Sequence, residues 1–63
     1  MSNVDQILEN LTDEQILALR DEANRAGDDL GASICNSALR GDANHRRAVA
    51  VMIDDARAQE DAS

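Results

Sequence analysis

The stretch RAGDDLGASICNSALRGDANHRR, residues 25–47, decides the fold because it contains two Gly-Asp pairs, Gly27-Asp28 and Gly41-Asp42. Glycine readily adopts the left-handed conformation that ends many helices, and aspartate is among the best residues at a helix N-cap. Each pair is therefore predicted to end one helix and to begin the next, with no spare residue between them. Corners this tight make neighbouring helices cross or run antiparallel.

Two further helix starts are predicted upstream of these corners. Ser2, with Asp5 three residues later, has the form of a capping box, and the apolar spacing that follows predicts a short helix from about Val4 to Asn10. Thr12 is the next predicted N-cap, and Gln15 stands where its side chain can return a hydrogen bond to the cap. This second helix is predicted to run to the first Gly-Asp pair.

Helical spacing also predicts which residues are buried in the three longer helices. In chain order, these apolar faces are Ile16, Leu19, Ala23 and Ala26, with Leu17 on the flank; Leu30, Ile34, Ala38 and Leu39; and His45, Val49, Met52, Ile53 and Ala56. The last helix should turn Asp54, Arg57 and Asp61 to water, and residues 58–63 should fray because nothing apolar anchors them.

The composition agrees with an all-α fold. The chain has no proline and eleven alanines, and no segment alternates with period two, so nothing predicts a strand. We expect one helical domain over residues 1–63, a small bundle of three main helices plus a short N-terminal helix. Such a short chain has a marginal core, and small chains of this kind often form homo-oligomers. Leu17 and Val51 lie off the main apolar faces. Each could be an ordinary isolated exposed residue, or together with Val4 or Leu8 they could form a self-association patch.

Charge and cysteine content exclude several classes of protein. The formal net charge is −7, which argues against direct nucleic-acid binding and against binding to an anionic membrane, but permits a basic protein partner. The single cysteine, Cys35, cannot form an internal disulfide and should pack as a small apolar residue. No segment is long and apolar enough to span a membrane or to act as a signal peptide, so we expect a cytoplasmic protein.

The residues offer little material for catalysis or metal binding. Cys35 and His45 could in principle form a nucleophile and its base, but nothing in so short a chain supplies a substrate cleft beside them. Adjacent aspartates such as Asp54 and Asp55 point about 100° apart on a helix, so they do not converge on one ion. We therefore expect no enzyme activity, no metal and no cofactor. The Arg-Gly-Asp tripeptide at residues 40–42 is interpreted as a helix end and a cap rather than as an adhesion motif.

The basic cluster at His45, Arg46 and Arg47 is the one candidate ligand site. If Asp42 is the N-cap, the cluster lies at the positive end of the helix dipole, where an anion is favoured and cations are not. A phosphate or carboxylate could bind there, for example a nucleotide held between protomers of an oligomer. In the alternative interpretation His45 packs on the apolar side of the helix and the arginines pair internally, Arg46 with Asp42 and Arg47 with an acid such as Asp28, Asp29 or one in the first helix.

Residues 11–59 resemble a type of short protein of tailed phages and prophages. The shared features are a Thr-Asp-Glu-Gln start, LRDEA, AGD, a cysteine followed by the pattern ALxGD, and an Ala/Arg-rich closing helix. The resemblance implies a phage or mobile-element accessory protein and transfers no catalytic residue. We expect a non-enzymatic protein that binds a host protein, for example as an inhibitor of a defence or DNA-handling protein. The exposed acids would carry this binding: Asp13, Glu14, Asp21, Glu22, Asp54 and Asp55. The alternatives are the phosphate-ligand binder and a purely structural self-association module.

Overall fold

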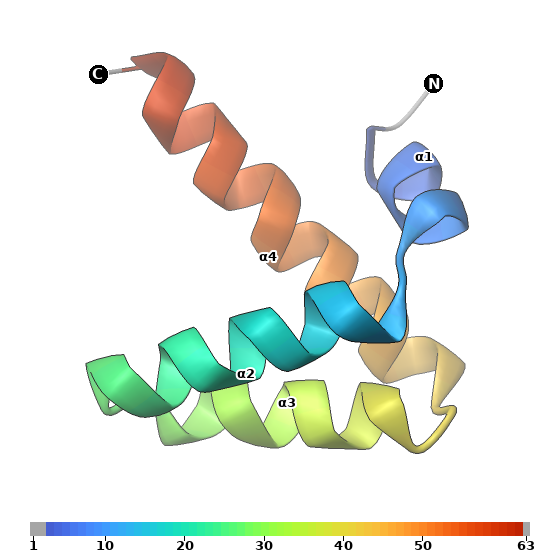
Figure 1. The fold of residues 1–63 in the computed structure, drawn as a ribbon. Coiled ribbons are helices and arrows are strands. Elements are labelled where there is room, and N and C mark those ends of the chain that lie inside the picture. The colour runs from blue at the N-terminus through green and yellow to red at the C-terminus, as the bar shows by residue number, and fades with distance from the viewer. Residues whose placement is uncertain (1–2, 63) are drawn as a thin grey trace.

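The computed structural model describes residues 3–62, and the side chains of residues 3–60. Four helices follow one another along the chain: α1 (Asn3–Asn10), α2 (Asp13–Ala26), α3 (Asp29–Leu39) and α4 (Ala43–Ala62). Figure 1 shows α2 and α3 as an antiparallel hairpin, α4 rising away from one end of it, and α1 packed against α4. No strand occurs within residues 3–62, so the predicted all-α class with a short N-terminal helix is confirmed.

The predicted corners and caps are present. Gly27 has φ +73° and Gly41 has φ +95°, both in the left-handed region that glycine adopts without strain. Thr12 and Gln15 form a complete capping box at the start of α2, and the Asp28 carboxylate accepts a hydrogen bond from the Gly31 amide at the start of α3. The predicted cap Ser2 lies outside the described residues.

The core lies where the N-terminal half of α4 meets the α2–α3 hairpin. Its buried residues are Leu11, Ile16, Cys35, Ala38 and Val49. Partly buried aliphatic residues surround them: Leu8, Leu19, Ile34, Leu39 and Ile53. All four buried residues of α3 are small, namely Gly31, Ala32, Cys35 and Ala38, so this helix contributes little volume to the core.

Three residues predicted to be buried are exposed: Ala26, Leu30 and Ala56. Leu30 is 73% exposed, and α3 instead buries a neighbouring face of small residues, Gly31, Ala32, Cys35 and Ala38. Figure 1 shows the reason. The start of α4 lies beside the C-terminal end of α3, and α4 then rises away from the α2–α3 corner, where the end of α2 (Ala26) and the start of α3 (Leu30) lie. No third helix therefore covers these two residues.

The C-terminal part of α4 extends beyond the core. The helix continues to Ala62, whereas Asp54 is half-buried rather than fully turned to water. Fraying of residues 58–63 stays a prediction. None of the helices in residues 3–62 combines the length and the apolar composition that crossing a lipid bilayer requires.

Candidate functional site

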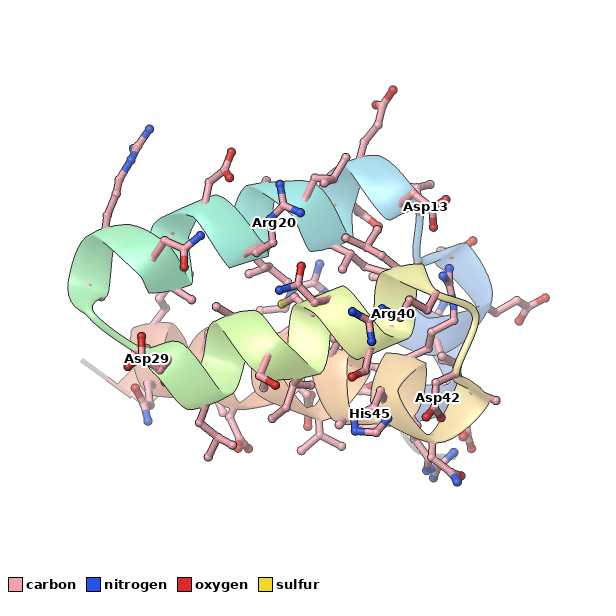
Figure 2. All side chains as sticks on the ribbon, turned by 90° about the horizontal axis from the view of Figure 1, so that it is seen from below. Asp13, Arg20, Asp29, Arg40, Asp42 and His45 are labelled. Carbon is pink, nitrogen blue, oxygen red and sulfur yellow. The ribbon has the colours of Figure 1, made fainter. Side chains whose placement is uncertain are left out.

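Asp42 caps the N-terminus of α4, as predicted. Its Oδ1 atom accepts hydrogen bonds from the backbone amides of Asn44, at 3.0 Å, and His45, at 3.3 Å. Its other oxygen, Oδ2, lies 2.7 Å from Nδ1 of His45 (Figure 2 labels both residues). That nitrogen is shielded from water and the contact is poorly aligned for a directed hydrogen bond, so we describe it as a close polar contact. The close contact with the His45 side chain, together with the hydrogen bond from the His45 amide, lowers the pKa of Asp42 below its usual value.

Arg46 points away from Asp42, which corrects the predicted pair between these two residues. Its guanidinium donates to the carbonyl oxygen of Leu11 at 3.1 Å, to the Asp13 carboxylate at 3.1 Å and, more weakly, to the carbonyl oxygen of Ala38 at 3.5 Å. The Asp42 carboxylate is already occupied by the amides of α4 and by His45. Arg46 therefore ties the start of α4 to the α1–α2 connection and to the end of α3.

Arg47 pairs with an acid in the first helix, one of the partners named for it from the sequence. Its Nη1 atom donates to Oδ1 of Asp5 at 2.9 Å, which joins α4 to α1. His45, Arg46 and Arg47 thus point to three different carboxylates and do not converge on one point. This arrangement favours the internal-pairing interpretation of the basic cluster, and anion binding there stays a prediction.

The other candidate chemical groups are also accounted for within the fold. Cys35 is completely buried, and this burial raises the pKa of its thiol. Arg40, Gly41 and Asp42 form the corner between α3 and α4, as the helix-end interpretation of this tripeptide predicts. In the described part of the chain, no group of three or more His, Cys, Asp or Glu side chains is placed to hold a metal ion.

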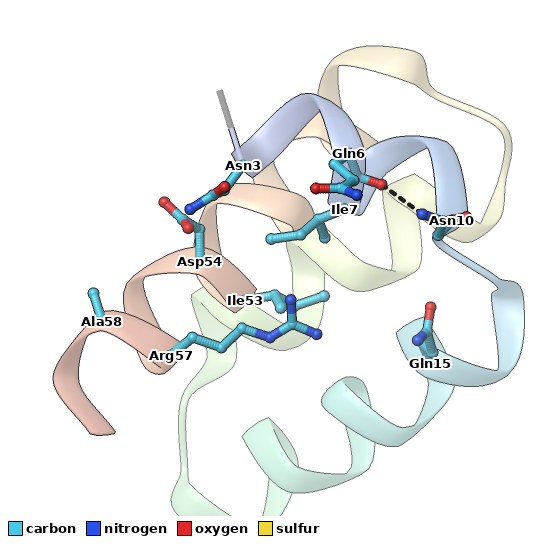
Figure 3. Close-up of a pocket in the computed structure, with 9 residues that line it drawn as sticks. All are labelled: Asn3, Gln6, Ile7, Asn10, Gln15, Ile53, Asp54, Arg57 and Ala58. Atoms are coloured by element: carbon cyan, nitrogen blue, oxygen red, sulfur yellow. Dashed lines mark hydrogen bonds between the residues drawn. The ribbon is translucent and has the colours of Figure 1, made fainter. Parts of the chain in front are cut away.

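A groove that the sequence did not predict lies between α1 and α4 (Figure 3). Its volume is about 510 Å³, within the ~300–1,000 Å³ range typical of ligand pockets. Ile7 and Ile53 supply its large apolar side chains. The remaining lining residues are polar or small: Asn3, Gln6, Asn10, Gln15, Asp54, Arg57 and Ala58. We call this feature the α1–α4 groove.

One wall of this groove follows a pattern that is visible in the sequence. Asn3, Gln6 and Asn10 follow the i, i+3, i+7 spacing of one helical face, so three side-chain amides line up on α1. The opposite wall comes from residues 53–58, about fifty positions later in the chain, and no local pattern connects the two segments.

Comparison of the chain with models of protein families, with curated proteins and with solved structures found no match.

Proposed function

We propose that this chain is a non-enzymatic protein that acts by binding a basic partner protein. The observation that carries the proposal is that several arginines make contacts within the fold, whereas several exposed acids do not. Arg46 and Arg47 are engaged in contacts between helices, and Arg20 of α2 donates to Asn36 of α3 at 3.3 Å. Three of the six arginines are therefore engaged in contacts between helices, while the chain carries thirteen acids.

Only some of the acids on the surface have such partners. Within the described residues, several exposed carboxylates form no ion pair: Glu9, Glu14, Glu22, Asp29 and Asp55. Of the acids named from the sequence, Asp13 pairs with Arg46 and Asp21 lies 3.9 Å from Arg20. Glu14, Glu22 and Asp55 therefore remain as outward charges, which favour encounter with a positively charged protein.

The proposal keeps the setting that the phage resemblance implies. A phage or mobile-element accessory protein of this kind would act in the host cytoplasm, and an inhibitor of a defence or DNA-handling protein fits because proteins that handle DNA carry basic surfaces. The buried Cys35 thiol, with its raised pKa, is a poor nucleophile, which supports binding rather than catalysis.

The test is a salt titration of complex formation with a purified partner. Host proteins captured by the chain are identified, and each is purified and mixed with it at 0.1 M and 1 M NaCl. The Debye length falls from about 10 Å to about 3 Å over this range, so we expect the association rate to fall at least tenfold. Glu14→Lys combined with Glu22→Lys should slow association at low salt, whereas Ser33→Asn, which changes an exposed side chain without changing charge, should not. An association rate that is independent of salt and of these charges would contradict the proposal.

Self-association is a second candidate function, which the exposed aliphatic side chains favour. Leu17, Leu30 and Val51 are 38%, 73% and 41% exposed. Light scattering would detect a homo-oligomer as a molar mass that is a multiple of 6.8 kDa. If Leu30 lies in the contact, Leu30→Ser should return the mass to that of the monomer; a monomeric wild-type protein would exclude this function.

A further inference from the structure

We propose that the α1–α4 groove binds an extended polypeptide segment of the partner protein, with one aliphatic side chain of that segment placed against Ile7 and Ile53. The inference rests on the proposed function, and it names the place on the molecule where the partner chain is held. Its basis is the set of hydrogen-bonding groups, the size and the charges of the groove.

Two amides of the groove are held in place by bonds within the chain. The Asn10 side-chain nitrogen donates to the backbone oxygen of Gln6 at 3.0 Å, which leaves the Asn10 side-chain oxygen as an acceptor (Figure 3). The Gln15 side-chain oxygen accepts from the Thr12 amide at 3.0 Å, which leaves the Gln15 side-chain nitrogen as a donor. One fixed acceptor and one fixed donor match the N–H and C=O groups that every peptide unit carries. Because both amides are already ordered, binding costs less conformational entropy.

The size of the groove favours an extended segment over a helix. An α-helix is about 10–12 Å wide with its side chains, so a volume of 510 Å³ holds only roughly one turn of it. An extended strand is thinner and presents its peptide groups along the whole length of the segment. Side chains alternate between its two faces, so one aliphatic side chain can contact Ile7 and Ile53 while its neighbours remain in water.

The charges of the groove argue for a peptide rather than a nucleotide. Asp54 and Arg57 lie one helical turn apart on α4, and neither forms an ion pair with any other side chain of residues 3–60. A wall with one charge of each sign suits the dipolar peptide backbone and gives no net attraction to a phosphate. The chain also has no aromatic residue on which a base could stack.

The probe for this test is a displayed library of random seven-residue peptides, selected on the immobilised full-length protein. We expect the selected peptides to share one aliphatic position. Their affinity should fall roughly tenfold or more in Arg57→Glu and in Ile7→Asn. Arg25→Glu is the matched control, because Arg25 is also exposed on a helix but lies outside the groove, and it should leave the affinity unchanged. Asp54→Asn is a second, milder change in the same α4 wall of the groove. Circular dichroism of each variant verifies that the helices are retained.

The proposal is overturned if no peptide is enriched, or if the selected peptides bind the Arg57→Glu and Asp54→Asn variants as tightly as the wild type. This outcome is separate from a failure of the proposed function. The salt titration and the Glu14→Lys/Glu22→Lys variant probe charges outside the groove. A salt-dependent complex that tolerates Arg57→Glu would therefore rule out the groove as the binding site and leave the proposed function standing.

Discussion

Replacing Arg46 with alanine is expected to lower the free energy of unfolding by about 2–3 kcal/mol. The Arg46 side chain is 26% exposed, and its bond to the Leu11 carbonyl oxygen joins a charged donor to a largely buried residue, which we place at about 1.5 kcal/mol. The Asp13 side chain is 69% exposed, so that ion pair adds only about 0.5 kcal/mol. The Ala38 bond is long, and the Gly41 amide also donates to the same oxygen, so its share is again about 0.5 kcal/mol.

Thermal unfolding followed by far-UV circular dichroism measures this loss. For a domain of this size, about 2–3 kcal/mol corresponds to a fall in Tm of roughly 10–20 °C. Asp13→Asn should cost only about 0.5 kcal/mol, and less at 1 M NaCl, where surface ion pairs are screened. Arg25→Ala, which removes an exposed arginine without an ion pair among the described residues, should stay within about 0.5 kcal/mol of the wild type.

The comparison between Arg46→Ala and Asp13→Asn decides whether the carbonyl bonds contribute. If they do, most of the Arg46→Ala loss persists at 1 M NaCl, because bonds to shielded carbonyl oxygens are screened less than exposed ion pairs. If Arg46→Ala costs no more than Asp13→Asn, Arg46 is only a surface ion pair and the reasoning above is wrong.

Three further predictions concern backbone conformation, pH and the thiol. Gly27→Ala should destabilise the fold by about 1 kcal/mol in urea unfolding. Its φ is +73°, and no atom beyond Gly27 and its two chain neighbours lies within 4 Å of the added carbon, so backbone strain alone is measured; an unchanged midpoint would contradict this. Contact with His45 lowers the pKa of Asp42 in the folded state. The contribution of Asp42 to the free energy of unfolding is therefore fully present above the usual pKa of 3.8 and is lost as the pH falls through the lower folded pKa. Asp42→Asn should flatten the dependence of stability on pH in that acid range, and an unchanged slope would refute the role given to Asp42. Cys35 should react with a thiol reagent far more slowly in the native protein than in urea, because its side chain is buried and its pKa is raised; equal rates would show that the thiol is accessible.

The helix boundaries could be predicted from the sequence because they depend on local interactions. Thr12 with Gln15, Asp28, and the glycines of both corners act on backbone groups within a few residues of themselves. Their hydrogen bonds and left-handed conformations require no distant partner. Residue type and spacing therefore sufficed to place them.

The buried face of α3 could not be predicted in the same way. The large residues Leu30 and Ile34 suggested one stripe, whereas the helix buries Ala32 and Cys35 a fraction of a turn away. Close packing of α2 on α3 favours small side chains at the contact, so size rather than hydrophobicity selected the face. The separation of α4 from the start of α3 then left Leu30 in water (Figure 1).

The site shows the same division between local and distant interactions. His45, Arg46 and Arg47 were correctly placed in the first turns of a helix. The partners of Arg46 and Arg47, however, are Asp13 and Asp5, which are more than thirty positions away. The predicted i, i+4 pair of Arg46 failed because the Asp42 cap was already occupied. The α1–α4 groove depends on the packing of the first helix on the last, which no local pattern encodes.

The position of two arginines near the positive end of α4 has a structural explanation. Cations there cost about 0.3–1 kcal/mol each against the helix dipole, less than the roughly 2–3 kcal/mol expected from the contacts of Arg46 alone. Neighbouring helical residues point about 100° apart, so Arg46 reaches the connection before α2 while Arg47 reaches Asp5 on α1 itself. These contacts hold α1 beside α4 and so help to form the groove. Each of these arginines pairs with one acid, so the negative surface follows from the excess of thirteen acids over six arginines, whereas the groove follows from the packing of α1 on α4.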